Sequence, residues 1–189
     1  MSADNQQERL LDPWYITGWF DGEGCFSVSV HPHPASKFKW LIDPAVQTYQ
    51  HKDAIDTLRR IQNYFECGSI RSKGPNSNVL TLSIESRKSI IEKVIPHFLK
   101  YPLQSPKRND FQLFCQIIEA MEMKHHQNLD GFCKLVELAF KMNPHGKNRK
   151  YSLDYIMNNL KESSETTRQT HENVKIWSDL YGDIEVKHQ

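Results

Sequence analysis

The chain lacks the features that mark secreted or membrane proteins. Its four cysteines are scattered and form no CxxC pair, which argues against a disulfide framework or a zinc site. No window approaches the roughly eighteen unbroken apolar residues that a membrane span needs. The first ten residues have neither the apolar core of a signal peptide nor the arginine-rich composition of a transit peptide. We therefore expect a soluble, intracellular protein with reduced thiols and no membrane partner.

The sequence also lacks a net charge of one sign. Its formal net charge is only +1, so composition alone does not indicate a nucleic-acid partner. The distribution is more informative, because acids concentrate in expected helices while basic residues form local groups. A basic surface is therefore compatible with the near-neutral sum. The basic groups lie at 37–39, 71–73, 107–108 and 147–150.

Length and composition predict one domain with an appended tail. The chain has 189 residues, of which 38% are hydrophobic, enough for a substantial core. We expect an N-terminal arm over residues 1–12, a core domain over 13–143, and a C-terminal basic segment with a helical tail over 144–189.

Hydrophobic periodicity predicts elements in the order α-β-β-α-β-β-α-α-α. Asp12 and Pro13 provide an N-cap and a first-turn proline for the first helix. Two antiparallel hairpins with helices packed on one face give an α+β fold whose other sheet face stays open. The expected helices are 14–21, 52–65, 87–101, 111–124, 131–143 and 151–161, and the expected strands lie within 26–33, 39–50 and a hairpin over 69–86.

The open face of this sheet is expected to carry hydrogen-bonding side chains and few acids. A solvated sheet face is the simpler explanation of such alternation. Solvated faces usually mix acids with lysine, however, whereas this composition better suits contacts to base edges and phosphates in a DNA groove. The residues assigned to the face are Ser27, Ser29, His31, His33, Gln47, Arg71, Lys73, Asn78, Thr81 and Ser83.

The segment WYITGWFDGEGCF places Gly18 and Gly22 on one face of the first helix. A glycine inside a soluble helix costs about 1 kcal/mol relative to alanine. A face without side chains allows a second helix to approach closely, although an ordinary close crossing with the core would also explain it. Asp21 and Glu23 follow at the helix end, where the dipole disfavours negative charge. A divalent cation would compensate for them.

This segment resembles the signature of the LAGLIDADG homing endonucleases. The resemblance continues in order through VQTYQHKDAIDTL, ECGSIRSKG, HFLKYPLQSPKRNDFQLF and KMNPHGKNRKYS, and so covers about residues 13–152. It implies an αββαββα fold with a saddle-shaped antiparallel sheet. It also implies site-specific cleavage of double-stranded DNA, as in intron homing.

The same resemblance implies a metal site at the end of the signature helix. Glu23 would be the catalytic carboxylate that binds Mg²⁺, with Ca²⁺ or Mn²⁺ substituting in vitro, and the Gly22 carbonyl would add a ligand. Asp21 would brace the helix end without binding the metal. Gln50 would order water around the cation.

Lys107 is the implied active-site lysine, near the scissile phosphate. Lys100 and Arg108 remain alternatives for that role. The position where the family often carries an arginine is Ala54 here, with Lys52 nearby.

Basic residues outside the active site are assigned to DNA binding. By the resemblance, Arg71 and Lys73 project into the major groove. Residues expected to bind phosphates, or to lie in the basic loop after the first strand, are Lys147, Arg149, Lys150, Lys37 and Lys39.

The chain has one signature, which supplies half of an active site. We therefore expect a homodimer formed through Thr17, Gly18, Asp21 and Gly22, acting on a near-palindromic target and leaving short 3′ overhangs. An RNA-splicing maturase that binds intron RNA, or a non-cleaving DNA-binding regulator, remains an alternative on the same fold. The sequence leaves open an organellar or a bacterial cytoplasmic location.

Overall fold

The computed structural model describes residues 11–142 and 149–165, and its elements follow the expected order. The strands are β1 (Gly24–Pro32), β2 (Trp40–His51), β3 (Ser69–Ser72) and β4 (Val79–Ile84). The helices are α1 (Pro13–Glu23), α2 (Ile55–Phe65), α3 (Arg87–Ser89), α4 (Ile95–Lys100), α5 (Lys107–Glu122), α6 (Leu129–Lys141) and α7 (Leu153–Glu165). Within these ranges, no helix combines the length and the hydropathy that a membrane crossing requires.

The four strands form one antiparallel sheet in the order β1-β2-β4-β3. Strand alternation separates its two faces, because successive side chains point to opposite sides. Phe26 lies opposite Val46, which in turn lies opposite Ile84, and all three are buried. Even-numbered residues of β1, β2 and β4 thus face the helices, and the predicted α+β fold is confirmed.

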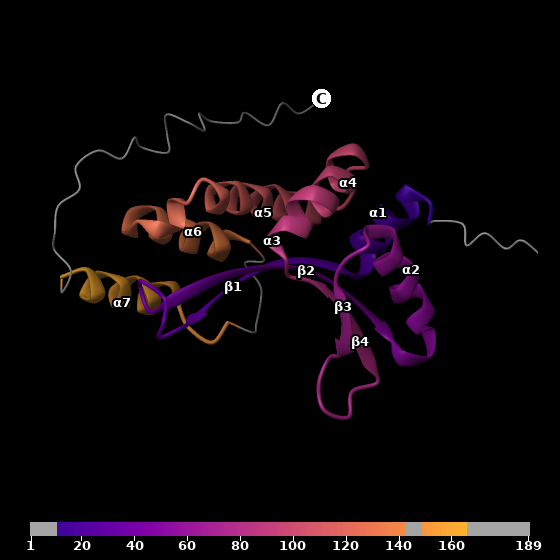
Figure 1. Ribbon diagram of the computed structural model, residues 1–189, viewed down its shortest axis with the longest axis horizontal. Coiled ribbons are helices and arrows are strands. Elements are labelled where there is room, and N and C mark those ends of the chain that lie inside the picture. Colours follow the sequence, from indigo (N-terminus) through magenta and orange to yellow (C-terminus); the bar gives the residue numbers. More distant parts are fainter. Residues whose placement is uncertain (1–10, 143–148, 166–189) are drawn as a thin grey trace, which may run out of the picture.

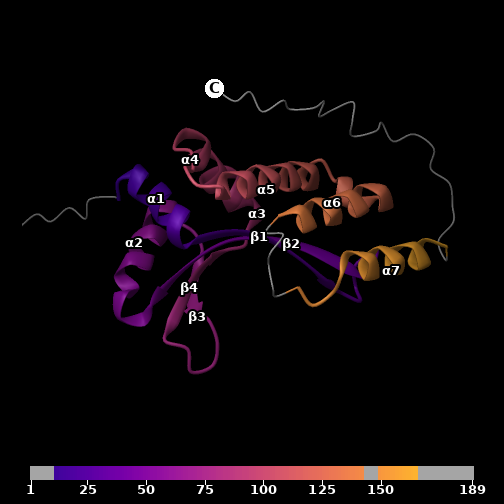
Figure 2. The same cartoon turned by 180° about the vertical axis from the view of Figure 1, so that it is seen from behind.

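The helices lie on one side of the sheet (Figure 1). Helices α3 to α6 cover the middle of the sheet, α1 and α2 lie at one end, and α7 lies near the far end of the β1–β2 hairpin. The view from behind shows the same layering, with α2 beside β4 (Figure 2). This arrangement leaves the second face of the sheet open, as predicted.

A cluster of aromatic rings joins the layers. The Phe98 ring of α4 lies with its centroid 5.1 Å from that of Phe20 in α1, 5.3 Å from that of Phe26 in β1 and 5.6 Å from that of Phe111 in α5. Offset and edge-to-face contacts of this kind add to the gain from apolar burial. Phe98 therefore links the signature helix to the sheet and to α5.

Several boundaries differ from expectation, among them the end of α1 at Glu23 and the start of α6 at Leu129. Helix α5 begins at Lys107 rather than Phe111, with Pro106 at the N-cap position, and the Lys107 amide donates to the Ser105 hydroxyl at 3.3 Å. On α7, Ile156 and Leu160 are fully buried and join the main core. Part of the segment after residue 143 thus packs onto the domain before it, and the division at that residue stays a prediction.

The position of Phe98 allows a stability test. Phe98→Ala should lower the free energy of unfolding by about 3–5 kcal/mol, because it leaves a cavity among aromatic rings. Its neighbour Leu99 is 69% exposed, whereas Phe98 is 1% exposed. Leu99→Ala is therefore the matched control and should change stability by less than about 0.5 kcal/mol. Urea unfolding would measure both, and equal losses would contradict the assigned core.

Candidate active site at the end of helix α1

Asp21 holds the last turn of α1 against the loop before α5. One carboxylate oxygen accepts a hydrogen bond from the Gln104 amide at 2.9 Å. The other accepts from the Ser105 hydroxyl at 2.7 Å and from its amide at 3.2 Å. Burial opposes the charged form, but these hydrogen bonds and nearby Lys107 hold the pKa of Asp21 below its ordinary value. Asp21 therefore braces the helix end, as predicted, and both of its oxygens are occupied.

Lys107 binds the end of the same helix from the first turn of α5. Its Nζ donates to the carbonyl oxygen of Phe20 at 2.7 Å and to that of Asp21 at 3.0 Å. A cation at this point stabilises the partial negative charge of the helix C-terminus. Burial lowers the pKa of Lys107, although Cys25 and nearby acids, Asp21 and Glu23 among them, favour its charged form.

The structure distinguishes Lys107 from the two alternatives for the active-site lysine. The Lys100 ammonium group lies 5.4 Å from the centroid of the Tyr101 ring at the end of α4. Arg108 is exposed on α5. Within the described residues, Lys107 is the basic side chain bound to the carbonyls of the signature helix.

Glu23 has an anchored backbone and an unengaged side chain. Its carbonyl oxygen accepts a hydrogen bond from the Thr48 hydroxyl at 3.3 Å, and that hydroxyl accepts from the Trp19 indole at 2.7 Å. The Glu23 side chain is exposed and makes no hydrogen bond or ion pair with any described residue. The two acids of the signature thus differ in their contacts, and metal binding by Glu23 stays a prediction.

The residues present fit a divalent cation, but one chain supplies only part of a site. Hard cations such as Mg²⁺ take about six oxygen ligands. The Glu23 carboxylate is available, and the Gly22 carbonyl accepts no side-chain hydrogen bond from the described residues, whereas Lys107 occupies two neighbouring carbonyls. No group of three or more His, Cys, Asp or Glu side chains able to hold a metal occurs in residues 11–142 and 149–165. The remaining oxygens would have to come from outside this chain.

Gln50 lies at the end of β2 on the same side as Thr48. Its Oε1 accepts a hydrogen bond from the amide of the next residue, His51, at 2.7 Å. This contact gives the side chain a structural role at the strand end. Its action on water near a metal stays a prediction.

The predicted dimer interface needs a correction. Thr17 is 1% exposed, because its hydroxyl donates to the Tyr101 carbonyl at 2.8 Å and lies 3.4 Å from Nε2 of the buried His97. Burial lowers the pKa of His97 to about 4, which leaves that ring neutral at pH 7. Thr17 is too buried to contact a second chain, whereas Asp21 is half-buried with its carboxylate bound to the loop before α5, so its contact with a second chain stays a prediction.

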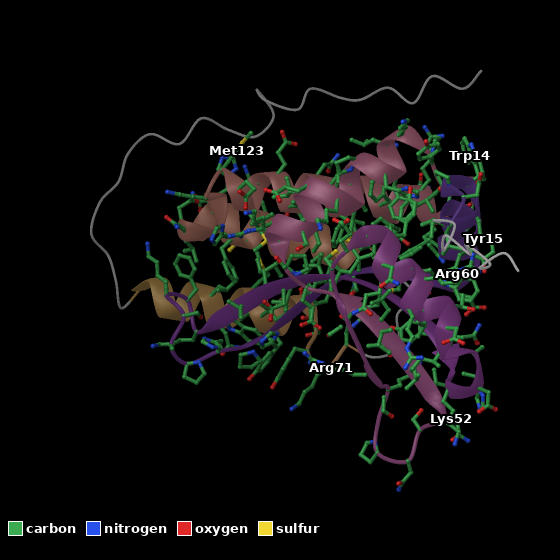
Figure 3. All side chains as sticks on the ribbon, turned by 45° about the vertical axis from the view of Figure 1, so that its right-hand side comes forward. Trp14, Tyr15, Lys52, Arg60, Arg71 and Met123 are labelled. Atoms are coloured by element: carbon green, nitrogen blue, oxygen red, sulfur yellow. The ribbon has the colours of Figure 1, made fainter. Side chains whose placement is uncertain are left out.

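The glycines do lie on the surface. Gly18 and Gly22 are exposed, and a Cβ added at either would meet no atom within 4 Å. Trp14 and Tyr15 flank this bare stripe with exposures of 52% and 45%, and both project from the outer side of α1 (Figure 3). The helix therefore presents a smooth surface with aromatic side chains beside it.

The open sheet face contains most of the predicted polar residues. Arg71 projects from it, away from the helices (Figure 3). His33, Lys73 and Asn78 lie in the turns that follow the strands. Residues that the register places on the face itself are Ser27, Ser29, His31, Gln47, Arg71, Thr81 and Ser83.

Several of these side chains are already occupied. Ser27 and Ser29 donate to carbonyls of β2 at 3.3 and 3.4 Å. Nε2 of His31 lies 3.4 Å from the carboxylate of Asp43. Asp43 was missed as a member of the face, although its odd position in β2 would have indicated it. These contacts weaken the case for Ser27, Ser29 and His31 as direct DNA contacts.

Thr81 and Ser83 also differ from the expectation of an accessible polar row. They are only 9% and 8% exposed because neighbouring side chains cover them. Ser83 donates to Glu85 at 2.8 Å and accepts from Gln47 at 3.2 Å. The sequence prediction missed Glu85 and Tyr49, both of which contribute to this face.

The basic residues outside the sheet that were predicted to bind DNA differ in how accessible they are. Lys37 and Lys39 donate to carbonyls of Gln127 and Pro34, each at 2.9 Å. Lys150 is exposed, with its Nζ 5.6 Å from the Tyr151 ring centroid. Lys147 lies outside the described residues.

Arg149 has a structural role at the end of α6. Its guanidinium donates to the carbonyls of Ala139, Phe140 and Met142 at 2.7, 3.0 and 2.6 Å and so caps α6. It also lies 4.3 Å from the centroid of the Phe140 ring. Burial lowers the pKa of Arg149 from its ordinary value. Its predicted contact with a phosphate stays a prediction.

An antiparallel sheet with one open polar face follows directly after a helix that ends in an exposed carboxylate. The model of the LAGLIDADG endonuclease family matches residues 16–118, and the chain belongs to that family. The predicted fold and resemblance are thereby confirmed.

Individual relatives agree with this assignment. A probable intron-encoded endonuclease 2 from Neurospora crassa is 31% identical over 133 residues, which are 70% of this chain and 29% of that protein. The solved homing endonuclease I-TnaI is 32% identical with a TM-score of 0.68, over 84% of this chain and 99% of that one. I-SmaMI, solved bound to an uncleaved DNA target with calcium ions, is 32% identical with a TM-score of 0.67, over 71% and 45%. The chain spans 25% to 60% of the first curated relatives that it matches.

The hydrogen bonds of Asp21 predict a pH-dependent contribution to stability. Asp21→Asn should lower the free energy of unfolding by about 1–2 kcal/mol at pH 7, because a neutral amide accepts weaker hydrogen bonds. The folded-state pKa is depressed, so this contribution is present above about pH 4 and is lost as the pH falls through the folded value. The difference from the wild type should therefore shrink at pH 3.

Urea unfolding at both pH values would measure this effect. Glu137→Gln, at an exposed position in the middle of α6, is the control and should change stability by less than about 0.5 kcal/mol. A stability loss from Asp21→Asn that is the same at pH 7 and pH 3 would refute the assigned charge effect.

Proposed function

We propose that the chain is one subunit of a homodimeric, site-specific DNA endonuclease that hydrolyses one phosphodiester bond in each strand. The observation that carries this proposal is the unengaged Glu23 carboxylate. It lies where the exposed glycine face of α1 meets the open polar face of the sheet. A nuclease needs its metal-binding acid at such a junction, because the acid must reach the DNA backbone while the sheet contacts the bases.

The site residues have separate tasks in this proposal. Glu23 and the Gly22 carbonyl hold a divalent cation, for which Mg²⁺ is proposed, since oxygen ligands suit a hard cation. When bound, such a cation supplies an activated water and stabilises charge on the leaving oxygen. Lys107 uses two of its three N–H donors on helix carbonyls, which leaves one for a phosphate oxygen. Asp21 keeps the helix end in place.

A dimer with two-fold symmetry would complete the site that one chain supplies in part. A two-fold interface through Gly18 and Gly22 would place one Glu23 from each subunit near opposite DNA strands. It would also supply from the second subunit and from DNA the oxygens that one chain lacks. The target would be near-palindromic, about two helical turns long, with cleavage leaving short 3′ overhangs. I-SmaMI, matched here over less than half its length, is a relative solved on DNA with calcium ions.

DNA contacts are proposed for the side chains that remain accessible. Arg71 and Gln47 are the proposed base contacts, and Lys73 and Lys150 the proposed phosphate contacts. A role in intron homing is supported by the intron-encoded relative. Maturase activity, an intron RNA partner and an organellar or bacterial location stay predictions.

Glu23→Gln tests the catalytic assignment. It should lower Mg²⁺-dependent cleavage of a randomised duplex pool on the order of 100-fold or more, because it removes the charged metal ligand. Binding of the same pool should stay within about two-fold, since Glu23 contributes no positive charge to DNA affinity. Sequencing of new DNA ends, with Mg²⁺ and then with a chelator, would measure cleavage. Glu137→Gln on α6 is the control, and normal cutting by Glu23→Gln would show the assignment to be wrong.

Gly18→Ala and Gly22→Ala test the proposed interface. Neither added methyl group meets an atom of its own chain, so each should raise the intrinsic stability of the subunit by about 0.5–1 kcal/mol through better helix propensity. The same methyl groups would hold two helices apart and weaken self-association about ten-fold or more. Sedimentation equilibrium would measure association.

Gly24→Ala provides the contrasting variant. A Cβ at that position would meet the Phe20 backbone at 2.8 Å, so stability should fall. Unchanged association of the Gly18 and Gly22 variants, or a wild type that stays monomeric on DNA, would refute the dimer.

A further inference from the structure

A chain of hydrogen bonds crosses the open face from Tyr49 to Glu85. The Tyr49 hydroxyl donates to Oε1 of Gln47 at 3.0 Å. Nε2 of Gln47 donates to the Ser83 hydroxyl at 3.2 Å. That hydroxyl donates in turn to Oε1 of Glu85 at 2.8 Å. The contacts join adjacent strands, because Gln47 of β2 lies opposite Ser83 of β4.

The carboxylate at one end determines the direction of every bond. A carboxylate only accepts hydrogen bonds, so the single hydroxyl hydrogen of Ser83 points to Glu85. The Ser83 oxygen can then only accept from Gln47, which requires the amide nitrogen of Gln47 on that side. The two ends of a glutamine amide usually have to be assigned from such a network. Here the network allows one orientation.

The tyrosine at the other end completes the orientation. Burial raises the pKa of Tyr49, and the neighbouring Cys25 thiol acts in the same direction, so the hydroxyl keeps its hydrogen and donates it. The Lys73 ammonium lies 4.4 Å from the centroid of the Tyr49 ring and holds that ring in place. Gln47 is therefore fixed from both sides.

The fixed amide retains one donor and one acceptor. Glutamine carries two N–H donors and two acceptor lone pairs, and the network uses one of each. One N–H and one lone pair therefore remain on a half-buried side chain of the open face. This pair complements N7 and the N6 amino group of adenine in the major groove.

We propose that Tyr49, Ser83 and Glu85 are positioning residues that orient Gln47 as a reader of adenine. This inference rests on the proposed function, because it concerns the DNA that the open face would bind. Neither Tyr49 nor Glu85 needs to touch DNA. Glu85 would even repel phosphates, so its presence on a DNA-facing surface is explained by its effect on the amide.

Selection from a randomised duplex pool tests the inference. The wild type should enrich a site in which adenine is favoured about ten-fold or more at one position per half-site. Gln47→Ala identifies that position, because preference there should disappear. Tyr49→Phe keeps the ring under Lys73 but removes the donor, and Glu85→Gln allows the hydroxyl and the amide to reverse. Each should reduce adenine preference at this position by about three-fold or more and leave other positions unchanged.

Matched controls separate positioning from a loss of folding. Tyr155→Phe on α7 and Glu137→Gln on α6 remove the same groups away from the sheet face and should leave the selected site unchanged. A purely structural role for Tyr49 or Glu85 would lower affinity and thermal stability together without changing base preference at one position. That result would overturn the inference.

The outcomes also distinguish this inference from the proposed function. If the wild type enriches a site, Gln47→Ala loses one position, and Tyr49→Phe and Glu85→Gln keep it, the positioning role is wrong and the function stands. If Gln47→Ala loses no position, Gln47 is not a reader and the inference also fails. If the wild type neither enriches nor cleaves any duplex, the proposed function itself is wrong.

Discussion

The site depends on how the C-terminal end of α1 is held against the start of α5. Asp21 accepts hydrogen bonds from the loop before α5, and Lys107 donates to the last carbonyls of α1. The charges of the Asp21 carboxylate and the Lys107 ammonium group compensate each other at this helix end, where the dipole would otherwise disfavour the acid. Both Asp21 oxygens thus accept hydrogen bonds from the chain itself, whereas the Glu23 carboxylate makes no contact with the described residues. These contacts distinguish the two acids of the signature.

On the open sheet face, too, some polar side chains bind one another and others keep free hydrogen-bonding groups. Alternation places polar side chains on it, but many of them satisfy one another, as His31 does with Asp43. Gln47 differs because its neighbours occupy only half of its hydrogen-bonding capacity. The free half of that capacity is the basis of the proposed contact with adenine.

Much of this arrangement could be predicted from the sequence. Particular residues show which contacts could not be predicted. Periodicity located the strands and the helix α2, and the signature located Glu23. Thr17 was wrongly assigned to an interface, because its hydroxyl reaches Tyr101, more than eighty residues away. Arg149 was assigned to phosphate binding because it belongs to a basic cluster, and the sequence does not say where each side chain of a cluster points. In the fold its guanidinium caps α6. Both cases concern contacts between different segments.

The sequence by itself determined the α+β order of elements, the glycine face of α1 and the presence of two acids at its end. These features follow from local periodicity and from helix geometry, which need no knowledge of the rest of the chain. Only the tertiary structure decided which acid is occupied, which lysine reaches the helix end and how the Gln47 amide is oriented. Each of those depends on hydrogen-bond distances between elements far apart in the chain, which local pattern does not specify.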